Sequence, residues 1–170
     1  MNSPRVSKLM KKPGRVLSRL SSRSSDAIRK AAWRLSKGRA ESTVPIFIVG
    51  AQRSGTTMLG ECLGRSPSIQ NLGESDPRAF TSFLLRDNET VVNLIADCPY
   101  EHLIFKPLKD SCRVDELLAL DPAAKGIWAF RDYADRINSA VRQFGRHPLD
   151  VFEQFKRGEA PAWQLVGMSA

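Results

Sequence analysis

The fold of this chain is limited first by a short apolar segment that runs directly into a loop bounded by two glycines. Residues 45–49 read Pro-Ile-Phe-Ile-Val, a continuous apolar run typical of a strand buried on both faces. Residues 50–57 follow as Gly-Ala-Gln-Arg-Ser-Gly-Thr-Thr, and a helical pattern of apolar residues begins at Thr56. The spacing is that of a phosphate-binding loop, GxxxxGK[ST], with Thr56 in the position of the lysine.

The rest of the chain alternates apolar runs with helical patterns. We predict strands at 45–49, 68–72, 102–106 and 125–130, and helices at 56–65, 77–86, 89–98, 113–120, 132–144 and 149–156. Regular alternation of strands and helices implies crossover connections and a parallel sheet. The sequence therefore predicts a three-layer α/β fold of the P-loop type, with a mostly parallel central sheet. In such sheets ligands bind at the carboxyl ends of the strands.

The loop has the residues of an anion site. Gly50 and Gly55 allow tight turns that direct backbone N–H groups inward, and the following helix adds its positive dipole end. The loop also supplies hydroxyl groups, and its cation is Arg53; the hydroxyl residues are Ser54, Thr56 and Thr57. A lysine that would reach the terminal phosphates of ATP is missing, so a kinase is the least favoured of the functions considered.

Two further strands are expected to end in cations rather than in a magnesium-binding aspartate. Lys106 follows the apolar residues 103–105, and Arg131 follows 127–130. Both side chains are therefore expected at the same sheet edge as the loop. This pattern favours direct binding of anions by the protein, and we expect no metal. An ordinary ion pair of Arg131 with Asp132 or Asp135, and a surface position for Lys106, are the structural alternatives.

The positive charge of the chain is concentrated in its first quarter. The formal net charge is +8 over 170 residues, but residues 1–43 hold 12 Lys/Arg against two acidic residues, and 44–170 hold 14 against 16. We expect two regions, a basic arm (1–43) and an α/β domain (44–170). The arm is expected to be disordered over 1–24, because its Ser/Arg-rich sequence buries little apolar surface, with a short amphipathic helix at 25–35.

The basic arm has several interpretations. Its helix could lie on an anionic membrane surface, grip an acidic polymer or pack beside the domain; its composition also fits an organellar transit peptide. Nucleic acid is not an expected partner, because the arm has one aromatic residue and no groove-reading motif. We find no secretory signal and no apolar run of about 18–20 residues that would cross a bilayer, so we expect a cytoplasmic protein, with peripheral membrane contact through the arm as one option.

Two segments resemble the sulfotransferases that use 3′-phosphoadenylyl sulfate (PAPS). Residues 45–59, PIFIVGAQRSGTTML, are similar to the family's 5′-phosphosulfate loop, especially in the branch with RSGTT that includes bacterial and tyrosylprotein sulfotransferases. Residues 124–144, AKGIWAFRDYADRINSAVRQF, are similar to its 3′-phosphate motif. In that motif an Arg ends a strand and a Ser lies eight residues later, the positions of Arg131 and Ser139.

The resemblance implies a PAPS-dependent sulfotransferase acting on a hydroxyl or amine. Donor binding is implied for the loop and for the second motif, that is for Gly50, Arg53, Ser54, Gly55, Thr56, Thr57, Arg131 and Ser139. Catalytic roles are implied for Arg53, for Lys106 near the transferring group, and for Glu74 as the base, because the tyrosylprotein branch has a Gly-Glu at a matching distance. The alternative for Glu74 is a carboxylate that caps the segment after it.

The chain departs from the family pattern after the second motif. Family members continue with another strand, an acceptor-binding region and a later loop over the nucleotide, and we expect this chain to be truncated at its C-terminal side. A catalytically inactive nucleotide- or anion-binding module is therefore the alternative function. The sequence contains no signature of a particular acceptor. A carbohydrate, a peptide and a small molecule therefore all stay open as acceptors.

Overall fold

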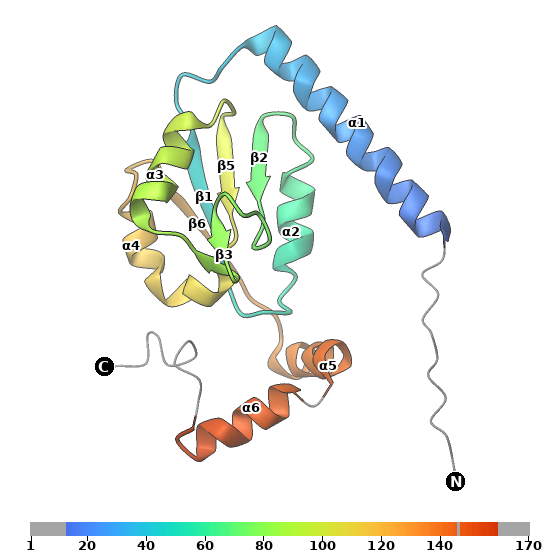
Figure 1. The fold of residues 1–170 in the computed structure, drawn as a ribbon, viewed down its shortest axis with the longest axis vertical. Coiled ribbons are helices and arrows are strands. Elements are labelled where there is room, and N and C mark those ends of the chain that lie inside the picture. Colours follow the sequence, from blue (N-terminus) through green and yellow to red (C-terminus); the bar gives the residue numbers. More distant parts are fainter. Residues whose placement is uncertain (1–12, 146, 160–170) are drawn as a thin grey trace.

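The structure is a computed structural model that describes residues 13–145 and 147–159. Its elements, coloured along the chain in Figure 1, are α1 (Pro13–Lys37), β1 (Val44–Gly50), α2 (Thr56–Leu63), β2 (Ile69–Leu72), β3 (Phe80–Thr81), β4 (Leu84–Leu85), α3 (Asn88–Asp97), β5 (His102–Phe105), the 3-10 helix η1 (Leu108–Arg113), α4 (Val114–Leu118), β6 (Lys125–Ala129), α5 (Tyr133–Phe144) and α6 (His147–Lys156). The strands β1, β2, β5 and β6 confirm the four predicted strands to within two residues at each end.

The central sheet has the strand order β2-β5-β1-β6, and every neighbouring pair is parallel. Strand β1 lies inside the sheet because it pairs with β5 on one side and with β6 on the other. All of its residues after Val44 are buried, as expected for a strand that is apolar on both faces. All four strands end at the same sheet edge. The predicted parallel α/β architecture is therefore confirmed.

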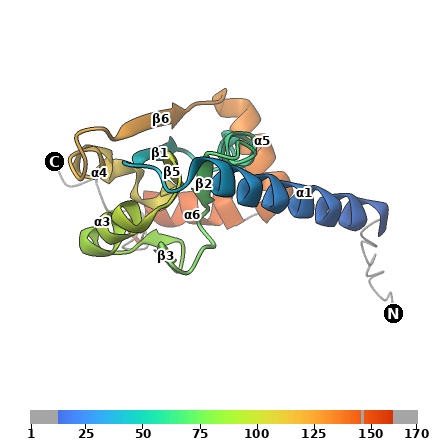
Figure 2. The ribbon, with the colours of Figure 1, turned by 90° about the horizontal axis from the view of Figure 1, so that it is seen from above.

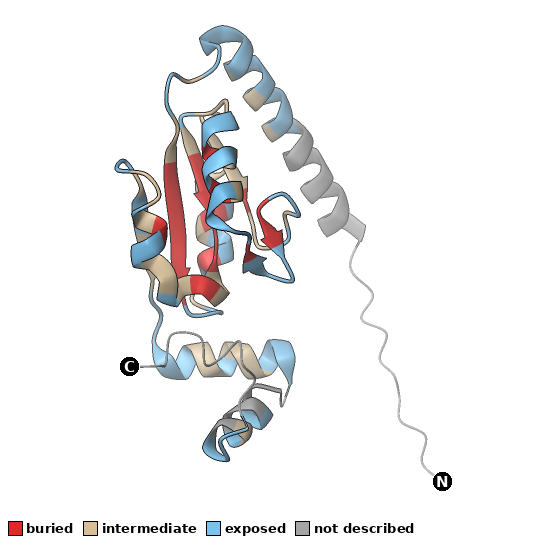
Figure 3. Ribbon diagram, turned by 60° about the vertical axis from the view of Figure 1, so that its left-hand side comes forward, coloured by how far each residue is buried: buried red, intermediate tan, exposed pale blue. Residues whose placement is uncertain are grey.

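Helices cover both faces of this sheet. On one face Phe47 and Phe105 stack with ring centroids 5.4 Å apart, and they belong to a buried cluster that includes Val91 and Ile95 of α3 and Leu117 of α4. On the other face a smaller cluster, formed by Ile46, Ile48 and Ile104, packs against Leu59 and Leu63 of α2. Figure 3 shows the buried residues concentrated in the strands between these helices.

The segment after β2 differs from the prediction. A helix was expected at 77–86, but this region holds turns and the two-stranded antiparallel sheet β3–β4. The apolar residues at 79, 80, 83 and 84 suit one helical face, yet here Phe80 and Leu85 are buried from a hairpin. The backbone N–H of Leu85 donates to Oδ2 of Asp110, 2.9 Å away and 25 residues later in the chain. This tertiary contact fixes the hairpin, and the local pattern does not reveal it.

Helix α1 is longer than expected. It begins at Pro13 instead of residue 25, so residues 13–24 are helical although disorder was expected there; residues 1–12 lie outside the described part. No proline or glycine interrupts residues 15–37, and once a helix has formed, each added residue gains a hydrogen bond. Within the described ranges, no helix is both long enough and apolar enough to cross a membrane.

The turn after β2 is held by a charged side-chain pair. Arg78 Nη2 donates to Oδ2 of Asp76 at 2.7 Å and its Nε to Oδ1 at 3.0 Å, and the backbone N–H of Arg78 also donates to Oδ1. The side-chain hydrogen bond from Arg78 lowers the pKa of Asp76 below its usual value of 3.8. The carboxylate therefore stabilises the fold above pH 3.8, and this contribution is lost as the pH falls below that value.

Replacement of Asp76 with asparagine is expected to lower the free energy of unfolding at pH 7 by about 1–2 kcal/mol, because charge-assisted hydrogen bonds contribute about 1.5–3 kcal/mol and the amide keeps one acceptor. The difference from the wild type should shrink in buffers below pH 3.8. Urea unfolding of both proteins, followed by circular dichroism at pH 7 and at a pH below 3.8, measures this difference in the free energy of unfolding. A difference that is the same at both pH values would contradict the role of the ionised carboxylate.

Candidate functional site

The glycine-bounded loop joins β1 to α2 at the carboxyl edge of the sheet. Gly50 and Gly55 have φ angles of 124° and 87°, and Arg53 has a φ of 69°, in the left-handed region. Residues other than glycine rarely adopt this region, so the loop backbone is strained at its one cation. Thr56, the first residue of α2, is only 3% exposed. The free N–H groups of the first turn of α2 thus lie at the loop, as anion binding requires.

Gly50 is required by a close approach of two strands. A Cβ atom at this position would lie 2.4 Å from the carbonyl oxygen of Ala129 in β6. The backbone N–H of Gly50 donates to Oγ of Ser111, 3.0 Å away in η1, and Ser111 Oγ also donates to the carbonyl of Leu108. The start of the loop is therefore fixed from two sides, by β6 and by η1.

Glu74, Lys106 and Thr57 come together at one end of the loop. Lys106 Nζ lies 3.0 Å from Oε2 of Glu74 and donates to Oγ1 of Thr57 at 2.9 Å. The Lys106 and Glu74 side chains are only 11% and 17% exposed, so Lys106 is a buried cation and not a surface residue at a strand end. Capping of the turn that follows Glu74 falls to Asp76, whose carboxylate accepts from the N–H of Arg78.

Arg53, Arg131 and Ser139 come together at the other end. They line one cavity of about 280 Å³ that is otherwise bordered by α5, and Arg53 Nε donates to Oγ of Ser139 at 3.0 Å. Arg131 follows β6, and Ser139 lies in α5, below the sheet in Figure 1. The two arginines, 78 positions apart in the chain, therefore face a common space.

The cavity carries a net positive charge. Three arginines line it, Arg53, Arg131 and Arg142, against the single carboxylate of Asp135. Arg131 Nη2 lies 3.6 Å from Oδ2 of Asp135, a long contact between exposed groups that contributes little on its own. The other acid considered as its partner, Asp132, instead caps α5 by accepting from the N–H of Asp135. The ion pair of Arg131 with Asp135 is thus present, but the described residues that line the cavity include no further carboxylate to balance the charges of Arg53 and Arg142.

Sequence reasoning gave Arg142 too little weight. It lines the cavity, whereas Arg136 of the same helix lies over the ring of Tyr133. The spacing from Ser139 could have revealed it, because residues three apart on a helix are neighbours. The structure describes no group of three or more His, Cys, Asp or Glu side chains placed to hold a metal ion.

Comparison with known proteins gives one match. Residues 45–96 match the model of the sulfotransferase family, a range that includes the loop and Glu74 but ends before Lys106, Arg131 and Ser139. No curated protein and no solved structure matched the chain. The match supports a sulfotransferase family, and with it sulfuryl transfer as the general class of reaction and a sulfate donor as substrate.

Proposed function

We propose that this protein transfers a sulfuryl group from PAPS to a hydroxyl or amine of an acceptor. The observation that carries the proposal is the shared cavity of Arg53, Arg131 and Ser139. A donor with phosphates on both sides of one ribose needs two anion-binding regions within the length of a single nucleotide. The loop 50–57 supplies one region and the cavity supplies the other, and Arg53 belongs to both.

The donor is assigned to these regions by charge. The N–H groups of the loop and of the first turn of α2, with the Thr56 and Thr57 hydroxyls, suit the 5′-phosphosulfate. Arg131 and Ser139 suit the 3′-phosphate, since a guanidinium can donate two parallel hydrogen bonds to a phosphate. Arg142 adds a second cation to the same cavity. Gly50, Ser54 and Gly55 contribute through the backbone shape of the loop.

The catalytic roles are assigned to the end of the loop where Glu74 and Lys106 meet Thr57, away from the cavity of Arg131 and Ser139. In the transfer the bond from sulfur to the bridging oxygen of the nucleotide breaks, and a bond from sulfur to the acceptor oxygen or nitrogen forms. Lys106, in contact with Thr57 of the loop, lies where it can stabilise charge that develops on the leaving oxygen. Glu74 takes the proton that the acceptor loses, as a general base. Arg53 contributes to the field at the donor.

A binding module without turnover is the second candidate. The observation that favours it is the ion pair between Glu74 and Lys106, because a carboxylate already held at 3.0 Å by a buried cation is partly engaged before an acceptor arrives. In both candidates the nucleotide site is the same. The acceptor, whether carbohydrate, peptide or small molecule, is a partner of the first candidate alone.

Calorimetric titration with adenosine 3′,5′-bisphosphate, the product nucleotide, tests the donor site without the acceptor. Arg131→Gln is expected to weaken binding about 10- to 100-fold, because hydrogen bonds to charged groups contribute about 1.5–3 kcal/mol and about 1.4 kcal/mol is a factor of ten. The matched control is Arg136→Gln, five residues later in α5 and directed to the Tyr133 ring, which should bind like the wild type.

Two outcomes would overturn the donor assignment. One is equal loss of affinity in the two variants, which would show a general effect of positive charge and no specific contact of Arg131. The other is tighter binding of ATP with magnesium than of the bisphosphate, which would favour the kinase. If the bisphosphate binds as expected, radiolabelled sulfate transfer from PAPS to a panel of hydroxyl and amine acceptors separates the enzyme from the binding module.

A further inference from the structure

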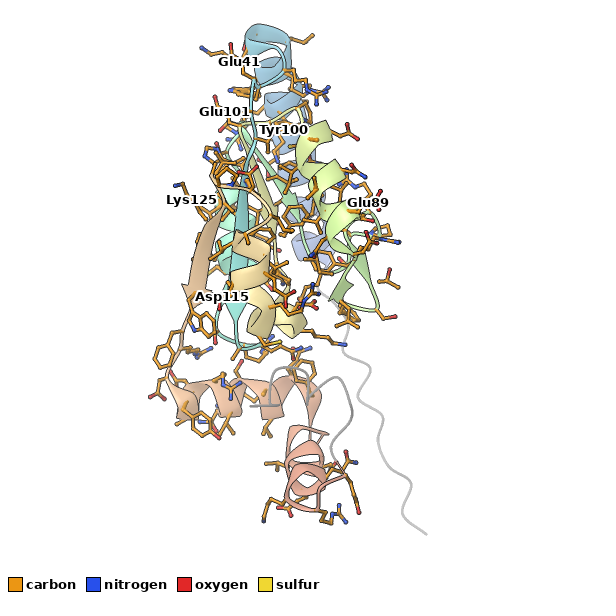
Figure 4. The ribbon with its side chains drawn as sticks, turned by 90° about the vertical axis from the view of Figure 1, so that its left-hand side faces the viewer. Glu41, Glu89, Tyr100, Glu101, Asp115 and Lys125 are labelled. Atoms are coloured by element: carbon orange, nitrogen blue, oxygen red, sulfur yellow. The ribbon has the colours of Figure 1, made fainter. Side chains whose placement is uncertain are left out.

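The part of α1 that approaches the domain does so with one side only. Trp33 stacks on Tyr100 with ring centroids 6.0 Å apart, and Lys30 and Arg34 lie over the same ring. Tyr100, labelled in Figure 4, lies where the chain enters β5. Arg29 Nη2 donates to the carbonyl of Arg65 at 2.7 Å. These contacts place the last third of the helix against the amino-terminal end of the sheet.

The opposite side of α1 is apolar and exposed. Ile28 and Leu35 are 69% and 89% exposed, and Ala32 between them is exposed as well. At about 100° per residue these three positions fall within an arc of about 60°, roughly 140° from Trp33. A helix that served only to pack on its own domain would turn its large aliphatic residues inward. Here Ile28 and Leu35 point to solvent.

Positive charge surrounds this apolar stripe. The 25 residues of α1 include seven Lys/Arg and one acid, Asp26, and Asp26 is already paired with Arg29 at 2.6 Å. Arg29 and Arg34 lie on either side of the stripe by helical position, about 100° and 120° from Ile28, and they border the side of α1 that contacts the domain. Figure 2 shows the N-terminal part of the helix projecting beyond the sheet. The exposed fractions of Ile28 and Leu35 show that the described part of the domain does not cover the stripe.

We propose that α1 lies on an anionic lipid bilayer, with Ile28, Ala32 and Leu35 inserted between head groups and its cations among the phosphates. An aliphatic stripe flanked by cations matches the surface of such a bilayer, where apolar and negatively charged layers adjoin. An acidic polymer offers the charge without the apolar layer and gives no reason for exposed Ile28 and Leu35. The carboxyl edge of the sheet, with the candidate site, lies at the opposite end from the α1 junction (Figure 1), so the site stays open to solvent.

Sedimentation of the full chain with vesicles of phosphatidylcholine, with and without phosphatidylserine, tests this proposal. Binding is expected to the phosphatidylserine vesicles and to fall as salt is added. Ile28→Ser/Leu35→Ser, which leaves the charge unchanged, is expected to weaken binding at least about tenfold, since each side chain loses most of its insertion free energy. The control Val92→Ser/Leu149→Ser removes exposed aliphatic residues, 42% and 43% exposed, from α3 and α6, and should bind like the wild type.

The same proteins are also titrated with heparin and with single-stranded RNA. Equal vesicle binding by the wild type and Ile28→Ser/Leu35→Ser would overturn the proposal, as would heparin or RNA binding tighter than vesicle binding. Circular dichroism of the variant checks that its helix content is retained. The outcome is independent of the sulfuryl-transfer proposal, because bisphosphate titration reports the nucleotide site separately.

Discussion

Glu74→Gln is expected to lower the rate of sulfuryl transfer by about 100- to 10,000-fold, the range of a positioned general base, while the affinity for adenosine 3′,5′-bisphosphate stays near that of the wild type. Glutamine cannot accept the proton, yet its amide oxygen can still accept a hydrogen bond from Lys106 Nζ, 3.0 Å from the present carboxylate. The two effects separate because Glu74 is paired with Lys106 and is not among the residues assigned to the phosphates of the bisphosphate. Initial rates with radiolabelled donor and calorimetry with the bisphosphate measure them.

Glutamine is a better test than alanine at this position. Alanine would leave the buried ammonium of Lys106 without its carboxylate, and removal of one partner from a buried pair can cost about 3–5 kcal/mol, so lost activity could reflect unfolding. Glu61→Gln, an exposed carboxylate in α2, is the matched control and should transfer normally. Full activity in Glu74→Gln would remove Glu74 from the mechanism. Parallel loss of bisphosphate affinity would assign it to donor binding.

Gly50→Ala is expected to lower the free energy of unfolding by about 3 kcal/mol or more. The new methyl group would meet the backbone of β6, 2.4 Å from the Ala129 carbonyl oxygen, at a φ of 124° that side chains rarely adopt. Overpacking costs typically about 1–3 kcal/mol and an unfavourable backbone conformation a similar amount. Because backbone atoms on both sides of the contact belong to the sheet, neither strand can move without loss of ladder hydrogen bonds.

Gly126→Ala in the neighbouring strand β6 is the control for this variant. A Cβ there would meet only the flexible tips of Leu118 and Val114, at 3.6 Å or more, so its stability should be close to that of the wild type. Urea unfolding of the two variants side by side measures the difference. Similar stabilities would show that β1 and β6 do not approach each other as closely as described.

Most of the sheet could be predicted because each strand is marked by a pattern of neighbouring residues in the sequence. Continuous apolar runs at 45–49 and 103–105 identify strands buried on both faces, and the glycines at 50 and 55 mark the loop between strand and helix. The helix predicted at 77–86 failed for the opposite reason. Its conformation depends on Asp110, far along the chain. It also depends on Ser82 and Phe83, which both have left-handed φ angles, whereas the residues typical of such turn positions are glycine, asparagine and aspartate.

The members of the site could be proposed individually, but their grouping could not be predicted. Lys106 and Glu74 were expected at one sheet edge, yet nothing in the sequence indicates that they form a buried ion pair joined to Thr57. Arg53 was expected to bind the donor and to act in catalysis, and the structure turns its Nε to Ser139, 86 residues away. The pairing of Arg53 with Ser139 depends on how α5 leaves the sheet, which the helical pattern of α5 does not fix.

The hydrogen bond from Arg53 to Ser139 also bears on how the donor nucleotide would be received. It tethers α5 to the loop in the free protein, so the entropy of bringing these two segments together is lost when the chain folds and not when the nucleotide arrives. Such preorganisation raises affinity without any added contact. The incoming phosphate has only to take over the side-chain hydrogen bonds of a receptor that is already assembled.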